Sequence, residues 1–300
     1  IAIPTKQPTQ QPQQQPTTRQ QNAGQQNADW KWSNPLKFVQ EQYRSWAEKG
    51  AKQWAIKATF ASNEPPASKY VRRLLLASIR HTDMSPPALA DFLLVQRPWQ
   101  TDPRIAAKSL YLILLLIQYE VDLSKFIPIT VKTDQVIAHF TQLANDPKNK
   151  SLAEAINQLG YIVRTKVMLH AAHPKLEGNL ALAEGQNDPA QINQKDTSLE
   201  ADLARYLSTI ANPAKILLST ASSAKDFTIA VMSQPAIEEV SNTVKLLRYI
   251  KQKDESQIAL NDGNAVLDTA KKFPYLQTAI LFPDDSQPPE PPFQRFVVSQ

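Results

Sequence analysis

Helical periodicity without a competing strand signal is the feature that most constrains the fold of this chain. Apolar residues recur at helical spacing at Leu36, Val39, Tyr43 and Trp46, and again at Ile237, Val240, Val244 and Leu247. No alternating β-branched run flanked by hairpin turns occurs. The pattern predicts helices at about residues 35–60, 66–81, 86–97, 102–120, 131–145, 151–172, 197–212, 235–252 and 256–271.

Short connections between these helices favour neighbours that stack in chain order, as in a helical solenoid or an antiparallel bundle. The chain has 300 residues, 42% of them hydrophobic, which suffices for one large core or two small ones. We expect a disordered Gln/Pro-rich tail over 1–28, a helical domain over 29–272 and a proline-rich extended segment over 273–300. Residues 173–197 are expected to form a long surface loop.

The sequence motifs that commonly mark an enzyme active site are missing from this chain. Without cysteine there is no disulfide, thiolate metal site or cysteine nucleophile, which fits a reducing compartment. The six glycines are not clustered, so no phosphate-cradling loop or dinucleotide fingerprint is present. His170 and His173 lack a third metal ligand nearby, and we expect surface or capping histidines. Adjacent carboxylates such as Glu238 and Glu239 are expected on solvated faces. We therefore expect no catalytic residues, no metal and no cofactor.

The most apolar stretch, residues 110–117, is far shorter than the roughly 20 residues that a membrane span needs. It predicts a buried core helix. No secretory signal is visible in the sequence.

Positive charge is concentrated in one short region. Residues 31–80 contain ten basic and three acidic side chains, a net charge of +7, whereas the whole chain carries +5. A local patch of this kind indicates an anionic partner, which nucleic acid, a lipid surface or an acidic protein would each satisfy.

The stretch IKATFASNEPPASKY, residues 56–70, places this charge on both sides of a loop. Pro66 suits a helical first turn, so the second helix is expected to start near it, with Lys69 in its first turn. Free backbone N–H groups and the positive dipole end favour an anion there. Lys57, at the end of the preceding helix, can approach across the turn. Lys57, Lys69 and Tyr70 would then form a shallow phosphate site; the alternative is ordinary solvated lysines at helix ends.

An aromatic leader precedes the basic stretch. It consists of apolar residues interleaved with two lysines, namely Trp30, Lys31, Trp32, Leu36, Lys37 and Phe38. It could lie in a membrane interface as an amphipathic helix, or its aromatic residues could pack on the domain. Trp46 and Trp54 are expected in the core.

An ordered set of short motifs resembles the ANTH domain, the lipid-binding module of CALM-type clathrin-assembly proteins and of huntingtin-interacting proteins. The set begins with K-A-T at 57–59, Pro66 and Lys69-Tyr70. Later marks are Ala88–Leu94, Arg97, Trp99, Lys108-Ser109-Leu110, Leu112-Ile113, Tyr161, Lys166, His170, Pro174 and E-G-N at 177–179. The resemblance covers roughly 35–180 well and 197–272 only as continuing helices. It implies an all-α, right-handed superhelical solenoid of about nine or ten helices.

The family's inositol-phosphate signature is a lysine, nine residues, and then K-x-[KR]-[HY]. On this sequence the four positions fall on Lys57, Ala67, Lys69 and Tyr70, so three match. Ala67 removes one phosphate contact, for which Arg72 or Arg73 could compensate.

The resemblance implies a non-catalytic, phosphoinositide-binding membrane adaptor in clathrin-mediated endocytosis or coat assembly. Its partners would be phosphatidylinositol 4,5-bisphosphate in membranes and clathrin, coat or actin-linked endocytic proteins. It would be cytoplasmic and peripheral to the plasma membrane or clathrin-coated vesicles. The main alternative is a helical scaffold that binds acidic peptides or partner helices without specific lipid recognition. Nucleic acid is not expected as a partner, because the patch is compact and no helix face is lined with Arg, Asn or Gln.

Overall fold

The computed structural model describes residues 49–79, 84–120, 123–147, 149–180, 196, 198–224, 227–251 and 254–277. All of these residues belong to one compact unit within 47–300. Several sequence predictions lie outside the described residues, namely the tail 1–28, the leader residues Trp30, Lys31, Trp32 and Lys37, and the proline-rich residues after 277.

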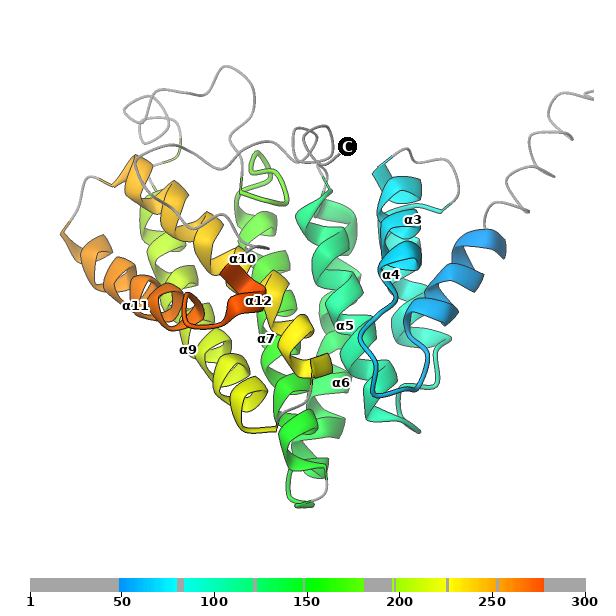
Figure 1. The fold of residues 1–300 in the computed structure, drawn as a ribbon. Helices are drawn as coiled ribbons and strands as arrows, with labels where there is room; N and C mark the ends of the chain where they lie inside the picture. The colour runs from blue at the N-terminus through cyan, green and yellow to red at the C-terminus, as the bar shows by residue number, and fades with distance from the viewer. Residues whose placement is uncertain are drawn as a thin grey trace, which may run out of the picture. The chain divides into compact units, whose positions relative to one another are not determined.

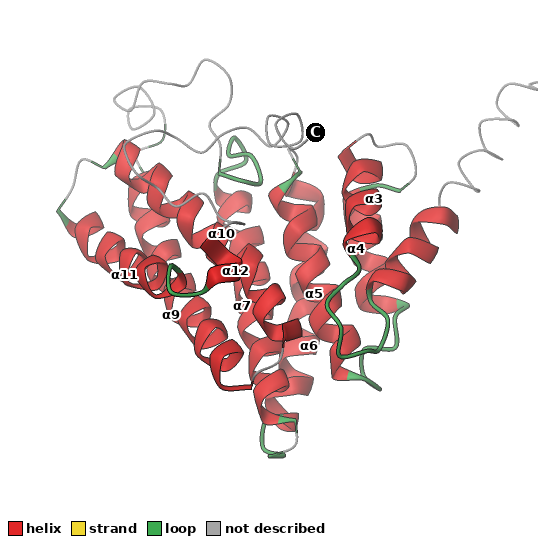
Figure 2. Cartoon of the chain, in the orientation of Figure 1, coloured by secondary structure: helices red, strands yellow, loops and turns green. Residues whose placement is uncertain are grey.

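Every regular element in the described residues is a helix, and no strand occurs among them (Figure 2). Residues 49–58 are helical. The elements that follow are α3 (Ser68–Ile79), α4 (Pro86–Val95), α5 (Pro103–Gln118), the 3-10 helix η1 (Leu123–Phe126), α6 (Ile127–Leu143), α7 (Lys150–Ala172), α9 (Leu199–Ala224), α10 (Phe227–Ile250), α11 (Glu255–Ala270) and α12 (Pro274–Gln277). The predicted all-helical fold class is confirmed.

The helices pack mainly against neighbours in chain order (Figure 1). Helix α5 contacts α3, α4 and α7; α7 also contacts α6 and α9; and α9 contacts α10 and α11. Helix α10 returns to contact α5 as well. Sequential stacking of this kind is what the short helix connections predict.

Helix α5 is enclosed by its neighbours. Every residue from Ile105 to Gln118 is buried, so the apolar run 110–117 is a core helix, as predicted. Asp102 caps the helix, since its carboxylate accepts the Arg104 backbone N–H at 2.9 Å, and Pro103 occupies the first turn. None of the helices in the described ranges is both long enough and apolar enough to cross a bilayer.

Two helices extend further than their prolines suggest. The sequence predicts a helix end at 212 and a helix start at 235, but Pro213 lies inside α9 and Pro235 lies inside α10. A proline inside a helix removes one backbone hydrogen bond and costs about 3 kcal/mol. Burial of apolar side chains in the extended parts, such as Leu217 and Met232, offsets that cost. The two predicted boundaries are therefore wrong.

The segment after α7 begins in the core. The sequence predicts a surface loop over 173–197, but within the described part His173, Leu176 and Leu180 are buried. The surface prediction is therefore wrong for His173, Leu176 and residues 178–180, whereas Pro174 and Lys175 are exposed as predicted. Leu180 also has a positive φ of 64°, which costs a non-glycine residue roughly 1–2 kcal/mol. Its side chain is fully buried, and this burial holds the residue in that conformation.

Gly178 allows this segment to approach the end of α5 closely. Its N–H donates to the Glu120 carbonyl at 2.9 Å. A Cβ at this position would lie 1.8 Å from the Ile117 carbonyl oxygen, far inside any allowed contact. The central glycine of the E-G-N motif is thus required by packing.

Helical packing continues beyond residue 272. Leu276 of α12 is fully buried, and Phe273 packs against the same core. Residues 273–277 therefore belong structurally to the helical unit.

Candidate functional site

The basic stretch forms a helix–loop–helix hairpin made of residues 49–58, the loop 59–67 and α3. Lys57 Nζ lies 5.5 Å from the centroid of the Tyr70 ring, and Arg73 lies 5.8 Å from the Trp54 ring. Lys57, the later of the two residues on the first helix, faces Tyr70, which is the earlier of the two on α3. The two helices therefore run antiparallel, which brings the end of the first helix to the start of the second.

The start of α3 differs slightly from the prediction. The helix begins at Ser68 rather than near Pro66, and Pro66 is buried just before it. The carbonyl of Ala67 accepts the backbone N–H groups of Tyr70 at 2.9 Å and Val71 at 3.3 Å, which makes Ala67 the N-terminal cap. Lys69 remains in the first turn, which contains no acidic residue.

Lys57, Lys69 and Tyr70 lie together at this end of the hairpin. Lys69 Nζ lies 5.0 Å from the Tyr70 ring centroid, on the same ring that Lys57 approaches at 5.5 Å. The separation of the two ammonium groups therefore cannot exceed the sum of these distances. Both lysines are exposed, and Tyr70 is partly buried against the core. Within the described residues no carboxylate forms an ion pair with either lysine.

The two arginines proposed to compensate for Ala67 have different surroundings. Both are exposed, but only Arg73 approaches an aromatic ring among the described residues, with its guanidinium 5.8 Å from the Trp54 centroid. Trp54, predicted to be in the core, is partly buried and packs on it. Ala67 is exposed beside the lysine pair, so its lack of a long side chain leaves that side of the site open.

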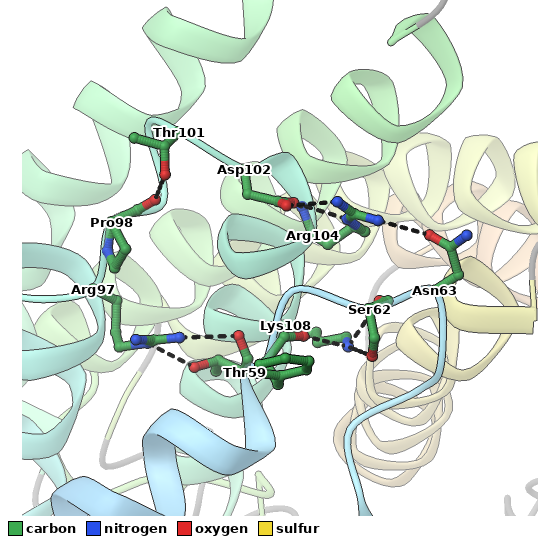
Figure 3. Close-up of polar contacts among 10 residues, drawn as sticks. Thr59, Ser62, Asn63, Arg97, Pro98, Thr101, Asp102, Arg104 and Lys108 are labelled. Carbon is green, nitrogen blue, oxygen red and sulfur yellow. Dashed lines mark hydrogen bonds and ion pairs between the residues drawn. The ribbon is translucent and has the colours of Figure 1, made fainter.

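A buried lysine holds the loop in place. Lys108 of α5 is 1% exposed, and its ammonium donates to the Phe60 carbonyl at 2.8 Å, the Ser62 carbonyl at 3.0 Å and the Ser62 hydroxyl at 3.2 Å (Figure 3). Burying an ammonium is costly unless it is hydrogen-bonded, and these acceptors supply that compensation.

Two arginines fix the start and the middle of the same loop (Figure 3). Arg97 donates to the Thr59 hydroxyl at 2.9 Å and to the Thr59 carbonyl at 3.2 Å. Arg104 donates to Asn63 at 3.1 Å while it pairs with Asp102. The hydrogen bond from Arg104 holds the pKa of Asp102 below its ordinary value. The loop is therefore tied to the helical body at several points.

A second polar cluster is fully buried between four helices. Lys166 of α7 and Glu239 of α10, both 0% exposed, form an ion pair at 2.6 Å. Glu239 also accepts the Tyr206 hydroxyl at 2.9 Å and the Gln118 amide at 3.0 Å. Burial lowers the pKa of Lys166, and the Glu239 carboxylate opposes that change. Glu239 is fully buried, so the prediction that it lies on a solvated face is wrong. Its counter-ion, Lys166, lies on α7, which is far from Glu239 in the sequence.

The two histidines considered as a metal pair are also buried. His170 is 1% exposed, with Nδ1 3.1 Å from the Leu176 carbonyl, and His173 is 3% exposed between Asp196 and Asp202. Burial, with the nearby Lys166 charge, lowers the pKa of His170 well below 6.5. His173 does cap α7, but the surface prediction is wrong for both. The part of the chain that the structure describes holds no cluster of three metal-ligating side chains.

Sequence reasoning found the lysine pair but missed how the loop is held. From the sequence, no role was predicted for Lys108, Arg97 or Trp99 beyond their place in motifs that resemble the ANTH domain. In the structure Arg97 and Lys108 bind the loop, and Trp99 is a core residue whose indole N–H donates to the Leu94 carbonyl at 2.7 Å. The sequence did contain a signal for this role, because Lys108 lies among apolar residues of a predicted core helix. A lysine at such a position is buried, and its ammonium then needs hydrogen-bond acceptors.

Comparison with known proteins identifies the fold. No family model and no curated protein matches this chain. It is similar to a chain in the structure of the endocytic adaptor complex AENTH, at 17% sequence identity and a TM-score of 0.57, covering 79% of this chain and 98% of that one. It is also similar to the ENTH domain from epsin-2 in complex with phosphatidylinositol 4,5-bisphosphate, with the same identity and TM-score, covering 80% and 98%.

These likenesses define the class: the chain has the helical fold of ENTH/ANTH-type domains. The resemblance expected from short motifs is confirmed at that level. The comparisons do not separate the ANTH branch from the ENTH branch.

Proposed function

We propose that this chain is a non-catalytic, peripheral membrane adaptor that docks on phosphoinositide headgroups, most strongly phosphatidylinositol 4,5-bisphosphate. Lys57, Lys69 and Tyr70 would contact the headgroup phosphates, with Arg72 and Arg73 beside them. The lysine pair over one tyrosine ring is the observation that carries this proposal. The epsin-2 ENTH domain, which shares the fold, is in complex with that lipid.

The chemistry of the pair suits a phosphate group. Two ammonium groups from different helices approach one tyrosine ring, and neither forms an ion pair with a carboxylate among the described residues. The N-terminal turn of α3 adds backbone N–H groups and the positive end of a helix dipole. Contact with the Tyr70 ring restrains each lysine side chain, so less side-chain entropy is lost when a headgroup binds.

Such docking is expected to be weak and reversible. Each lysine close to an anionic leaflet contributes about 1 kcal/mol, and this attraction fades within a Debye length of about 10 Å at 0.1 M salt. One shallow headgroup site therefore needs a further contact for stable recruitment. The leader residues Trp30, Lys31, Trp32 and Lys37 remain a proposal for such a contact.

A cytoplasmic adaptor peripheral to the plasma membrane or to clathrin-coated vesicles fits this chemistry. We propose a role in clathrin-mediated endocytosis or coat assembly, with clathrin, coat or actin-linked proteins as partners. Support for this role comes from the motif resemblance and from the shared fold with the endocytic adaptor complex AENTH.

The test is co-sedimentation with vesicles that contain or lack phosphatidylinositol 4,5-bisphosphate, at two salt concentrations. The Lys57→Glu/Lys69→Glu variant should lose the lipid-dependent pelleting. A matched control, Lys215→Glu/Lys272→Glu, makes the same change in net charge at two exposed lysines, one on α9 and one in the turn between α11 and α12, and should pellet like the wild type.

Equal pelleting with all anionic vesicles, unaffected by the first variant, would contradict a specific headgroup site. Absence of pelleting with any vesicle would favour the alternative of a scaffold for acidic peptides or partner helices.

A further inference from the structure

An exposed aromatic side chain follows the first lysine of the site closely in the chain, because Phe60 lies three residues after Lys57. Phe60 is 65% exposed, and Ile56, one helical turn earlier, is 41% exposed. Helix 49–58 turns Ala51, Ala55 and Ala58 into the core, and Trp54 packs against the same core. The opposite, exposed face carries Ile56 and Lys57 and continues to Phe60 just beyond the helix end.

The backbone that carries Phe60 is firmly held. The Phe60 carbonyl accepts a hydrogen bond from the buried Lys108 ammonium at 2.8 Å, and Arg97 binds the preceding Thr59 at two points. An exposed phenylalanine on a mobile segment could fold back over apolar surface. Here the hydrogen bonds from Arg97 and Lys108 fix the backbone on both sides of Phe60, and its ring is exposed.

The surroundings of this apolar pair are basic. The described stretch 49–79 contains six basic residues and one acidic residue. An apolar face surrounded by cations fits a surface that is anionic outside and apolar beneath, and the interface of an anionic bilayer combines both properties. An acidic protein surface would satisfy the charge but would leave the protruding ring without an apolar layer to enter.

We propose that Phe60, assisted by Ile56, inserts into the acyl-chain boundary of the bilayer while Lys57 and Lys69 hold the adjacent headgroup. This inference rests on the proposed function and names the second contact that a single shallow site requires. Phe60 adds membrane affinity and contributes nothing to recognition of the headgroup itself.

Three variants test the insertion. Phe60→Ser should weaken binding to vesicles containing phosphatidylinositol 4,5-bisphosphate roughly tenfold, the effect of losing one buried aromatic contact. Phe60→Leu, which stays apolar, should keep most of the affinity. Ile258→Ser is the matched control, because Ile258 is 69% exposed on α11, and it should bind like the wild type.

Each variant is also titrated with soluble inositol 1,4,5-trisphosphate, which offers phosphates but no acyl layer. Unchanged affinity of Phe60→Ser for this probe, together with weakened vesicle binding, supports the insertion. Unchanged vesicle binding of Phe60→Ser overturns the insertion and leaves the proposed function intact. Loss of both affinities also overturns it, because Phe60 would then act on the headgroup site. A wild-type protein that binds no vesicles overturns both proposals.

Discussion

The buried pair of Lys166 and Glu239 makes a quantitative prediction about stability. Glu239→Gln preserves shape but leaves the Lys166 ammonium, which is 0% exposed, without a counter-charge. Breaking a buried ion pair by neutralising one partner costs about 3–5 kcal/mol. Lys166→Met should cost a similar amount, because the carboxylate then keeps only the donors Tyr206 and Gln118.

The double variant Lys166→Met/Glu239→Gln contains no buried charge in this cluster. It should therefore be destabilised by at least roughly 2 kcal/mol less than the sum of the two single variants. Urea denaturation followed by circular dichroism measures the unfolding free energies of all four proteins. Additivity within about 0.5 kcal/mol would refute the reasoning, since it would mean that the two groups do not interact in the folded state.

Three further predictions concern a close backbone approach, the buried lysine that holds the loop, and a buried histidine. Gly178→Ala should cost at least about 2 kcal/mol of unfolding free energy, because its Cβ would lie 1.8 Å from the Ile117 carbonyl oxygen. Gly50→Ala should be neutral or stabilising, because among the described residues its Cβ would meet only Trp54, at 3.8 Å. Equal effects of the two substitutions in thermal denaturation would contradict the close approach at Gly178. Lys108→Met should lower the unfolding free energy by roughly 2–3 kcal/mol and speed amide hydrogen exchange in the loop 59–67, because the carbonyls of Phe60 and Ser62 lose a charged donor. Unchanged exchange would mean that Lys108 does not hold the loop. The pKa of His170 is held well below 6.5 in the folded chain, so below pH 6.5 the unfolded chain binds a proton that the folded chain does not. The unfolding free energy should therefore fall as the pH drops below 6.5, by up to about 1.4 kcal/mol per pH unit. His170→Asn should remove that part of the pH dependence, and an unchanged slope would refute it.

Local signals in the sequence predicted the helical class and the hairpin that carries the lysines. Helical spacing is repeated through most of the chain, and Pro65 and Pro66 mark the one break between Lys57 and Lys69. A short loop forces its two ends together. The approach of these two lysines was therefore predictable without knowledge of the rest of the fold.

Features that depend on distant partners were not predictable in this way. Pro213 and Pro235 normally break helices, and only the burial of the surrounding apolar residues keeps α9 and α10 continuous. Glu239 has an acidic neighbour in sequence, which is typical of a surface, yet its counter-ion lies on α7. Lys108 reaches a loop that precedes it by more than forty residues.

Binding of the soluble headgroup tests the central claim most directly. Isothermal titration calorimetry with inositol 1,4,5-trisphosphate separates recognition of the headgroup from general attraction to an anionic surface. The site predicts saturable binding at a single site, weakened at least roughly tenfold, or 1.4 kcal/mol, in Lys57→Glu/Lys69→Glu. Lys215→Glu/Lys272→Glu should bind like the wild type. Equal affinity of the two double variants, or no binding by the wild-type chain, would contradict a headgroup site at Lys57 and Lys69.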